Sequence, residues 1–158
     1  MGLIGRLSSG QAVNDRPNSH IGSEVAEFLP RVLSSLTAPS EKFSVVEVDF
    51  GDEIIGKSLC VKTCPGDKII YAQRPKRNGL SRFVKDREPE PTNKFVVILL
   101  RGNFDEFVLI TAFFGPEAQP EPWDRAADVS ALEFWNNHAL IYNKTDIIPG
   151  TETCICPW

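Results

Sequence analysis

The chain has 158 residues, 42% of them hydrophobic, which is the size and composition of one domain with one substantial core. No run of about 18 apolar residues is present, so the sequence excludes a membrane-spanning helix and predicts no membrane partner. The formal net charge of −4 argues against a protein that coats nucleic acid non-specifically, because neutralising phosphates requires a basic surface.

Residues 1–19 are rich in Gly, Ser, Asn and Asp and have no apolar period, which predicts a flexible N-terminal arm. The N-terminus lacks the apolar core of a signal peptide, and position 6 is Arg where the myristoylation pattern requires Ser or Thr. These features favour a cytoplasmic location with reduced cysteines and leave export by a route without a signal open. Residues 20–158 are expected to form a single α+β domain.

An amphipathic helix is predicted directly after the arm. Its apolar residues recur at the spacing of one helix face, and they are Ile21, Val25, Phe28, Leu29, Val32, Leu33 and Leu36. Asn18 or Ser19 can cap its first free amides. Pro30 lies within the pattern and removes one helix hydrogen bond, so we expect a kink or a break there.

Alternating apolar residues and turn signals predict the strands. A first strand is expected at 43–50, and two short runs at 54–61 and 68–73, separated by Pro65-Gly66-Asp67, could pair as a hairpin. The strongest sheet signal is the pair of runs at 94–100 and 106–114, which are joined by a loop of hairpin length. Both runs are apolar on both faces, which places them centrally in an antiparallel sheet.

The C-terminal part of the sequence predicts a second helix. After a proline-rich loop, Asp124 can cap a helix over 124–137 in which Val129, Leu132 and Trp135 share one side. A further strand is expected from His138 to Tyr142. An N-terminal helix, a central antiparallel sheet and a late helix together define an α+β fold.

One segment concentrates positive charge. The residues from Arg74 to Arg87 carry a net charge of +5, which leaves −9 for the rest of the chain. A localised anion site fits this distribution better than an extended nucleic-acid track. Arg74, Arg77 and Arg82 can bind phosphate through planar guanidinium groups, and Ser81 can donate to a phosphate oxygen. The alternative is a solvated loop beside a strand.

The two histidines lie at opposite ends of the predicted helices. His20, on the polar side of the first helix, would feel the positive end of the helix dipole, which favours a neutral ring that can act as a general base. His138 follows the end of the second helix, where the dipole favours a protonated ring that can act as a general acid. The alternatives are an ordinary exposed histidine and a helix cap.

Two further side chains are candidates for the same site. By the two-residue strand period Thr111 shares a face with Phe107, Leu109 and Phe113, so its hydroxyl needs a hydrogen-bond partner or a ligand. Trp123 ends a stiff proline-rich loop and is a candidate for stacking on an RNA base. Each has a structural alternative, because threonine is a good strand former and a tryptophan can be buried under such a loop.

Four cysteines form two close pairs, Cys60/Cys64 and Cys154/Cys156. Four thiolates suffice in number for a structural zinc site. The C-x3-C and C-x-C spacings differ from the usual C-x2-C knuckle, so free thiols are the main expectation and a zinc-stabilised module is an alternative. No other cofactor is expected.

The order of these residues resembles that of the barnase, EndoU, colicin and RelE superfamily of ribonucleases, and most of all its bacterial RNase-A-like toxin domains. The segments that carry the resemblance are His20 to Leu29, Leu80-Ser81-Arg82-Phe83 and Ile110-Thr111-Ala112-Phe113, within residues 20–115. The resemblance implies His20 as general base or acid, Arg77 or Arg82 as phosphate ligands and Thr111 as a transition-state hydrogen-bond donor. The sequence departs from the family at Phe113, where members often carry Tyr.

The sequence therefore predicts a metal-independent ribonuclease that uses histidine acid–base catalysis, with RNA and an inhibitory or immunity-type protein as expected partners. The alternative from another class is a non-catalytic interaction module whose acidic surface binds a basic protein.

Overall fold

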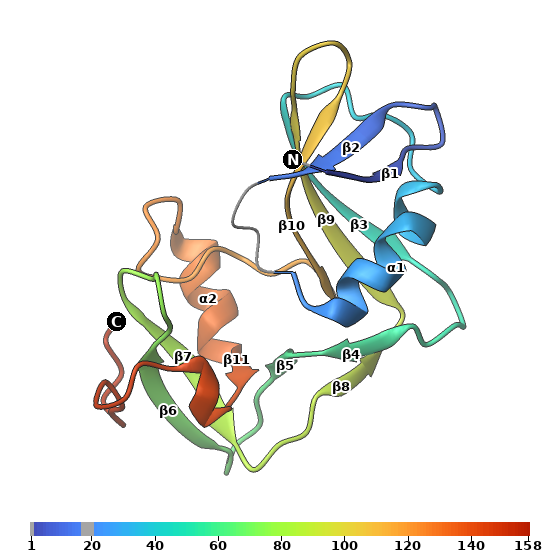
Figure 1. Ribbon diagram of the computed structural model, residues 1–158. Helices are drawn as coiled ribbons and strands as arrows, with labels where there is room; N and C mark the ends of the chain where they lie inside the picture. Colours follow the sequence, from blue (N-terminus) through green and yellow to red (C-terminus); the bar gives the residue numbers. More distant parts are fainter. Residues whose placement is uncertain (1, 17–20) are drawn as a thin grey trace. The chain divides into compact units, whose positions relative to one another are not determined.

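The computed structural model describes residues 2–16 and 21–158 and has an α+β fold, as the sequence predicts. Within these residues the chain forms two α-helices and eleven strands in three sheets (Figure 1). By its contacts it divides into two compact units where the sequence predicts one domain. Unit 1 comprises Met1–Gly56 and Thr92–Pro116, and unit 2 comprises Lys57–Pro91 and Glu117–Trp158.

Unit 1 is built on a five-stranded sheet of order β1-β2-β10-β9-β3. Its strands are β1 (Leu3–Arg6), β2 (Ala12–Asp15), β3 (Phe43–Asp49), β9 (Lys94–Arg101) and β10 (Phe107–Phe114). β9 and β10 pair antiparallel inside the sheet, so the predicted central hairpin is confirmed. These strands are apolar on both faces because neither is at an edge.

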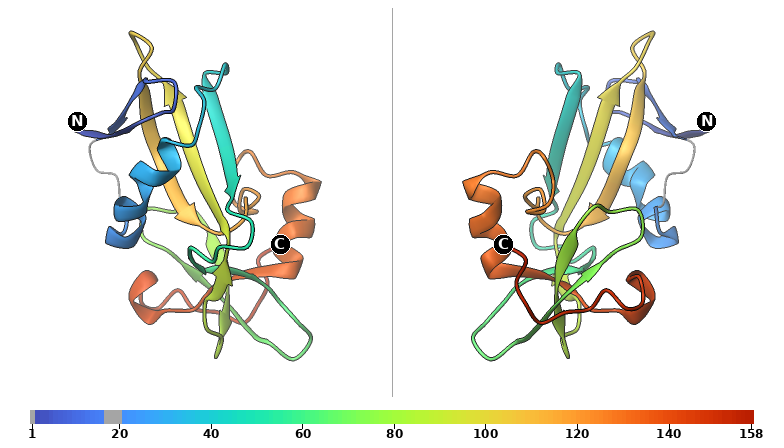
Figure 2. Two further views of the ribbon diagram at one scale, coloured as in Figure 1. Left: turned by 90° about the vertical axis from the view of Figure 1, so that its right-hand side faces the viewer. Right: turned by 90° about the vertical axis from the view of Figure 1, so that its left-hand side faces the viewer.

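Helix α1 (Ser23–Leu33) covers one face of this sheet (Figure 2). Leu29, Val32 and Leu33 are buried and pack on the inner side chains of the central strands, which are Phe95, Val97, Leu99, Phe107 and Leu109. The helix continues through Pro30 without a break, although an interior proline removes one helix hydrogen bond. Gly22 is the N-cap residue, and the predicted caps Asn18 and Ser19 lie outside the described residues.

The segment that the sequence pattern assigned to a flexible arm contains two strands. β1 pairs antiparallel with β2, and β2 pairs parallel with β10. Leu7 and Val13 are buried in the unit 1 core. The pattern missed these strands because each is four residues long and because β2 pairs with β10, which lies about ninety residues further along the chain.

Unit 2 is built on a four-stranded sheet of order β5-β11-β7-β6. Its strands are β5 (Cys60–Lys62), β6 (Lys68–Gln73), β7 (Leu80–Lys85) and β11 (His138–Ile141). The predicted hairpin between 54–61 and 68–73 is wrong, since β11 and β7 lie between β5 and β6. β6 pairs with β7, and β11 runs parallel to β7 and antiparallel to β5.

Helix α2 (Val129–Asn137) begins five residues later than the sequence predicts. Its N-cap is Asp128, whose carboxylate accepts from the Ala131 amide at 3.1 Å. Asp124 instead accepts from the Ala126 amide at 3.0 Å, which closes a local turn before the helix. A short 3-10 helix (Lys144–Asp146) follows β11.

A third sheet has two short strands, β4 (Gly56–Ser58) and β8 (Glu90–Thr92), where the chain passes from one unit to the other. Neither described helix has the length and apolar composition that crossing a membrane requires.

Candidate functional site

Six of the predicted site residues belong to unit 2, around the β6–β7 hairpin and the start of β11, and they are Arg74, Arg77, Ser81, Arg82, Trp123 and His138. Ser81 lies opposite Ala72 and Arg82 opposite Tyr71 in the antiparallel hairpin. Because β11 runs parallel to β7, its first residue lies at the same end of the sheet as the first residues of β7. The fold thus brings the basic hairpin and His138 together.

Arg74 is held by groups of the protein itself. Its Nε donates to Ser81 Oγ at 3.1 Å, and its Nη2 donates to the Glu121 carboxylate. Ser81 is fully buried and Glu121 is only 9% exposed. The charge of Arg74 is therefore offset, and Ser81 is not accessible to a phosphate in this conformation.

Glu121 is a residue that sequence reasoning missed. Its second carboxylate oxygen, Oε1, is buried and has no hydrogen-bond partner among the described residues. The carboxylate also influences Cys60, whose pKa is raised to about 12 by burial first and by the nearby Glu121 charge second. Only the unusual burial of an acid in a proline-rich loop distinguishes it, and burial is not visible in the sequence pattern.

Arg82 is held by neutral groups. Its Nη1 donates to Thr63 Oγ1 at 3.1 Å and to the main-chain oxygen of His138 at 2.8 Å. Its guanidinium also contacts the Tyr71 hydroxyl. Burial and a hydrogen bond with Cys156 raise the pKa of this hydroxyl, whereas Arg82 lowers it. No carboxylate pairs with Arg82 within residues 2–16 and 21–158, so its charge remains available to an anion.

The His138 ring has a fixed orientation. It stacks on Phe134, with the ring centroids 3.9 Å apart and the planes 2° from parallel. Nδ1 lies 2.8 Å from the main-chain oxygen of Phe134. A carbonyl oxygen can only accept, so this hydrogen bond assigns a proton to Nδ1, and in the neutral ring Nε2 is then the acceptor nitrogen.

Arg77 lies in the loop between β6 and β7, and Trp123 lies in the loop before α2. Arg77 is exposed, and its Nη1 donates to the main-chain oxygen of Pro75 at 3.4 Å. Trp123 packs on Gly79, where an added Cβ would lie 2.3 Å from the tryptophan Cβ. Its indole N–H is buried without a partner in the described part of the chain. Trp123 thus packs against the basic hairpin itself.

The predicted face of Thr111 is wrong. A β-bulge at Ile110 shifts the register of β10 against β9, so that Leu109 pairs with Leu99 but Thr111 pairs with Ile98. A bulge adds one residue and reverses the alternation beyond it. Ala112, and not Thr111, joins Leu109 in the core under α1. Thr111 belongs to unit 1.

His20 lies outside the described residues, so its predicted position on the helix has no structural counterpart.

The cysteines do not support the zinc alternative. Cys64, Cys154 and Cys156 are exposed and Cys60 is partly buried. Among the described residues no group of three or more His, Cys, Asp or Glu side chains could hold a metal ion.

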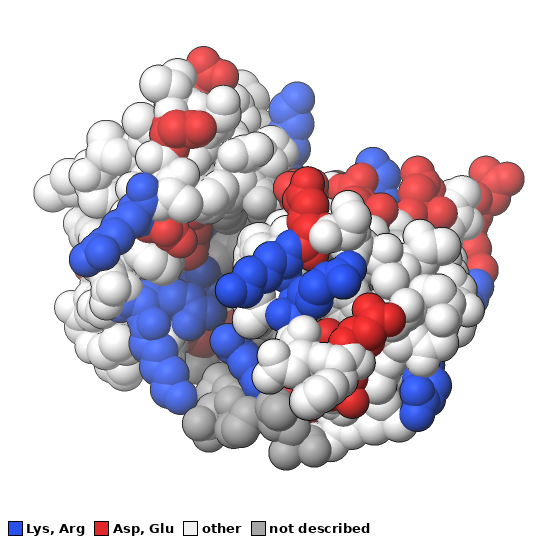
Figure 3. Space-filling view, turned by 90° about the horizontal axis from the view of Figure 1, so that it is seen from above, with Lys and Arg blue, Asp and Glu red and all other residues white. Residues whose placement is uncertain are grey.

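The charge is distributed unevenly between the units. Unit 1 carries six Lys and Arg against ten Asp and Glu, whereas unit 2 carries eleven of each. On the face in Figure 3 basic and acidic side chains are interspersed. In the basic strip Arg87 pairs with Asp67 at 2.9 Å and with Glu90 at 3.2 Å, so the strip is partly neutralised by its own fold.

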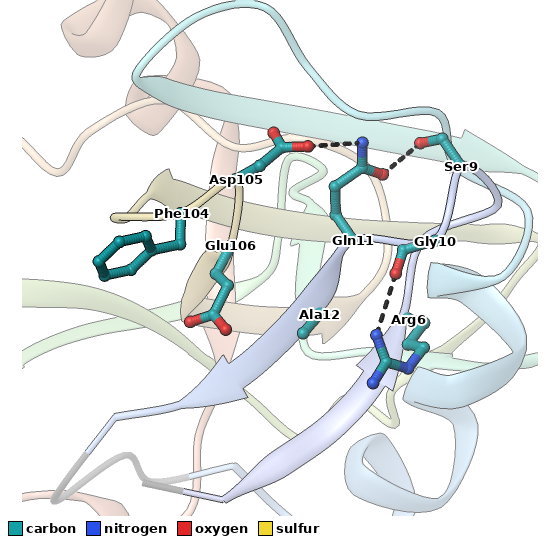
Figure 4. Close-up of a pocket in the computed structure, with 8 residues that line it drawn as sticks. All are labelled: Arg6, Ser9, Gly10, Gln11, Ala12, Phe104, Asp105 and Glu106. Carbon is teal, nitrogen blue, oxygen red and sulfur yellow. Dashed lines mark hydrogen bonds between the residues drawn. The ribbon is translucent and has the colours of Figure 1, made fainter.

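A polar pocket of about 350 Å³ lies in unit 1 beside the β1–β2 and β9–β10 loops (Figure 4). Gln11 donates to Asp105 at 3.2 Å and bonds to Ser9, and Arg6 donates to the Gly10 oxygen at 3.1 Å. Phe104, which is 95% exposed, points away from these groups. The pocket contains none of the predicted site residues.

Comparison with known proteins gives no relative: no family model, no curated protein and no solved structure matches this chain.

Proposed function

We propose that this protein is a metal-independent endoribonuclease-like domain that cleaves RNA through attack of a ribose 2'-hydroxyl on the adjacent phosphorus. The observation that carries the proposal is the orientation of His138. Its Nδ1–H is fixed by the Phe134 oxygen, and the other nitrogen is left as the proton donor or acceptor. An imidazole held in this way has the geometry that general acid–base catalysis requires.

The second support is the positive charge next to His138. Arg82 binds the main-chain oxygen of His138, and within the described part of the chain it has no carboxylate partner. A guanidinium has five N–H donors, so those that Thr63 and His138 leave free can bind a phosphoryl oxygen. Preorganised donors of this kind stabilise the charge that develops in the transition state.

In the proposed reaction the 2'-oxygen attacks phosphorus in line as a base removes its proton, and an acid protonates the departing 5'-oxygen. His138 fills one of these roles through Nε2. His20 is the sequence-based candidate for the other role. Arg77 and Arg82 of unit 2 are the candidates for phosphate binding, and the sequence-based role of Thr111, which belongs to unit 1, stays a prediction. Arg74 is a weaker candidate than the sequence predicts, because Glu121 offsets its charge.

The test is incubation of the purified chain with single-stranded RNA in EDTA, followed by analysis of the product ends. We expect 2',3'-cyclic phosphate ends and no cleavage of the matching 2'-deoxy oligonucleotide. The chain has two histidines, so His20→Ala and His138→Ala each remove one imidazole and the double variant removes both. Loss of a general acid or base lowers the rate about 10²- to 10⁴-fold.

The arginines provide a matched control. Arg82→Gln is expected to lower the rate about 10²- to 10³-fold, whereas Arg125→Gln, an exposed change in the loop before α2, leaves it unchanged. The proposal is overturned if the chain does not cleave RNA, if the double histidine variant cleaves at the wild-type rate, or if both arginine variants lose activity equally.

A further inference from the structure

A second pocket of unit 1 combines an apolar floor with an acidic rim. It has a volume of about 400 Å³ and lies between the first turns of α1, the end of β10 and the segment before β4. Its lining residues are Glu24, Glu27, Phe28, Ile55, Gly56 and Phe114. A volume of this size is in the usual range for ligand pockets.

The floor of the pocket is formed by packed aromatic rings. Phe28 and Phe114 have ring centroids 5.6 Å apart, and Phe114 packs edge-on against the buried Phe95 at 5.1 Å. Gly56 is pressed against Phe114, since an added Cβ would lie 2.6 Å from its ring. These contacts hold Phe114 in place, so the floor is preformed.

The rim carries two carboxylates that have no basic partner within the described residues. Glu24 and Glu27 are exposed and one helical turn apart, so they lie on the same side of α1. Arg31, one turn beyond Glu27, is directed elsewhere. It donates to the Glu53 carboxylate at 2.7 and 2.5 Å and lies over the rings of Phe28 and Phe50.

We propose that this pocket binds a Lys or Arg side chain presented by a protein partner. The aliphatic stem of such a side chain packs on apolar surface while its charged end remains at the edge, where Glu24 and Glu27 are located. The excess of acidic residues in unit 1 favours a basic partner for the same reason. The inference is independent of the proposed nuclease chemistry, because none of the residues that line this pocket has a role in that proposal.

The alternative role of the two acids is purely local. Negative side chains in the first turns of a helix are stabilised by the helix dipole, whether or not a ligand binds. That role predicts no affinity for a cation, so a binding measurement distinguishes the two.

The test is a titration followed by NMR, with the side-chain signals of Phe28, Ile55 and Phe114 as the readout. The probes are N-acetyl-lysine N-methylamide and N-acetyl-norleucine N-methylamide, which share an aliphatic stem and differ in the ammonium group. We expect saturable shifts with the lysine probe and an affinity for the norleucine probe that is roughly 1.4- to 5-fold weaker, the range that exposed ion pairs give. Added salt should reduce the difference.

Matched variants locate the effect. Glu24→Gln with Glu27→Gln should bring the lysine probe to the affinity of the norleucine probe, whereas Glu133→Gln, an exposed acid on α2, should change nothing. Unchanged signal dispersion in each variant shows that the fold is retained. The proposal is overturned if both probes bind equally or if the shifts arise only from self-association. It is also overturned if free spermidine binds more tightly than a peptide that contains two lysines.

Discussion

Arg82 Nη1 donates to the main-chain oxygen of His138 at 2.8 Å, so a side chain of β7 holds the residue where α2 ends and β11 begins. The same nitrogen donates to Thr63 Oγ1, beside the end of β5. One guanidinium thus joins three segments of unit 2. This relationship links the stability of the unit to the position of the candidate catalytic ring.

Arg82→Lys should destabilise the protein by about 1–2 kcal/mol, because hydrogen bonds to charged groups each contribute on that order and a lysine cannot reproduce the planar fork. Arg77→Lys, at an exposed position, should change the free energy of unfolding by less than about 0.5 kcal/mol. Urea unfolding of both variants measures the difference. Equal midpoints would contradict a holding role for Arg82.

Gly79→Ala should displace Trp123. The added Cβ would lie 2.3 Å from the Trp123 Cβ and 2.5 Å from its Cγ, which forces one of the two segments to move. Overpacking of this kind costs about 1–3 kcal/mol. Thermal unfolding and tryptophan fluorescence report the change. Gly2→Ala is the control, since nothing lies within 4 Å of that position, and a silent Gly79→Ala would show that the contact is not tight.

Cys60 should make the protein less stable in alkali. Burial raises its pKa from 9.0 to about 12 in the folded chain, so the folded state holds a proton that the unfolded state releases. The stability that this thiol contributes is complete below about pH 9 and is lost as the pH rises towards 12. The free energy of unfolding of the wild type and of Cys60→Ala, measured from pH 8 to 11, should converge or cross as the pH rises.

The same thiol should react slowly. At pH 8 the three exposed cysteines should be modified by a disulfide reagent well before Cys60, because the thiolate is the reactive species. Counting the fast and slow thiols of the wild type and of Cys60→Ala checks this. A slow thiol that persists in Cys60→Ala would assign the protection to another cysteine.

Asp128→Ala should destabilise α2 by about 1 kcal/mol, because the Asp128 carboxylate accepts from the Ala131 amide at 3.1 Å as an N-cap. Asp128→Asn keeps an acceptor and should retain most of this stability. Thermal unfolding distinguishes the variants, and an effect of Asp128→Asn as large as that of Asp128→Ala would refute the capping role.

The parts of the fold that the sequence predicts correctly are those with strong local patterns. The β9–β10 hairpin and α1 have long apolar runs with the right period, and they form where the pattern indicates. The strand that starts at His138 is likewise confirmed. Local propensity alone would end the helix at Pro30, but tertiary packing extends α1 through this residue.

The errors arise where distant segments decide the structure. β11 separates β5 from β6 although it follows them by more than sixty residues, so no local pattern reveals the pairing. The bulge at Ile110 moves Thr111 to the other face, and no glycine stands at this position that would have indicated a bulge in the sequence. No strand was predicted in the basic strip, although β7 (Leu80–Lys85) lies within it and pairs with β6. The pairing of Arg74 with Glu121 depends on a loop far along the chain.

The placement of β11 has a consequence for synthesis on the ribosome. All strands of unit 1 have been made once residue 114 is joined to the chain, whereas the four-stranded sheet of unit 2 still lacks its second strand until residue 141. During that interval the β6–β7 hairpin has an open hydrogen-bonding edge on the β7 side. The nascent chain therefore exposes that edge to chaperones or to aggregation until β11 emerges and pairs with β7.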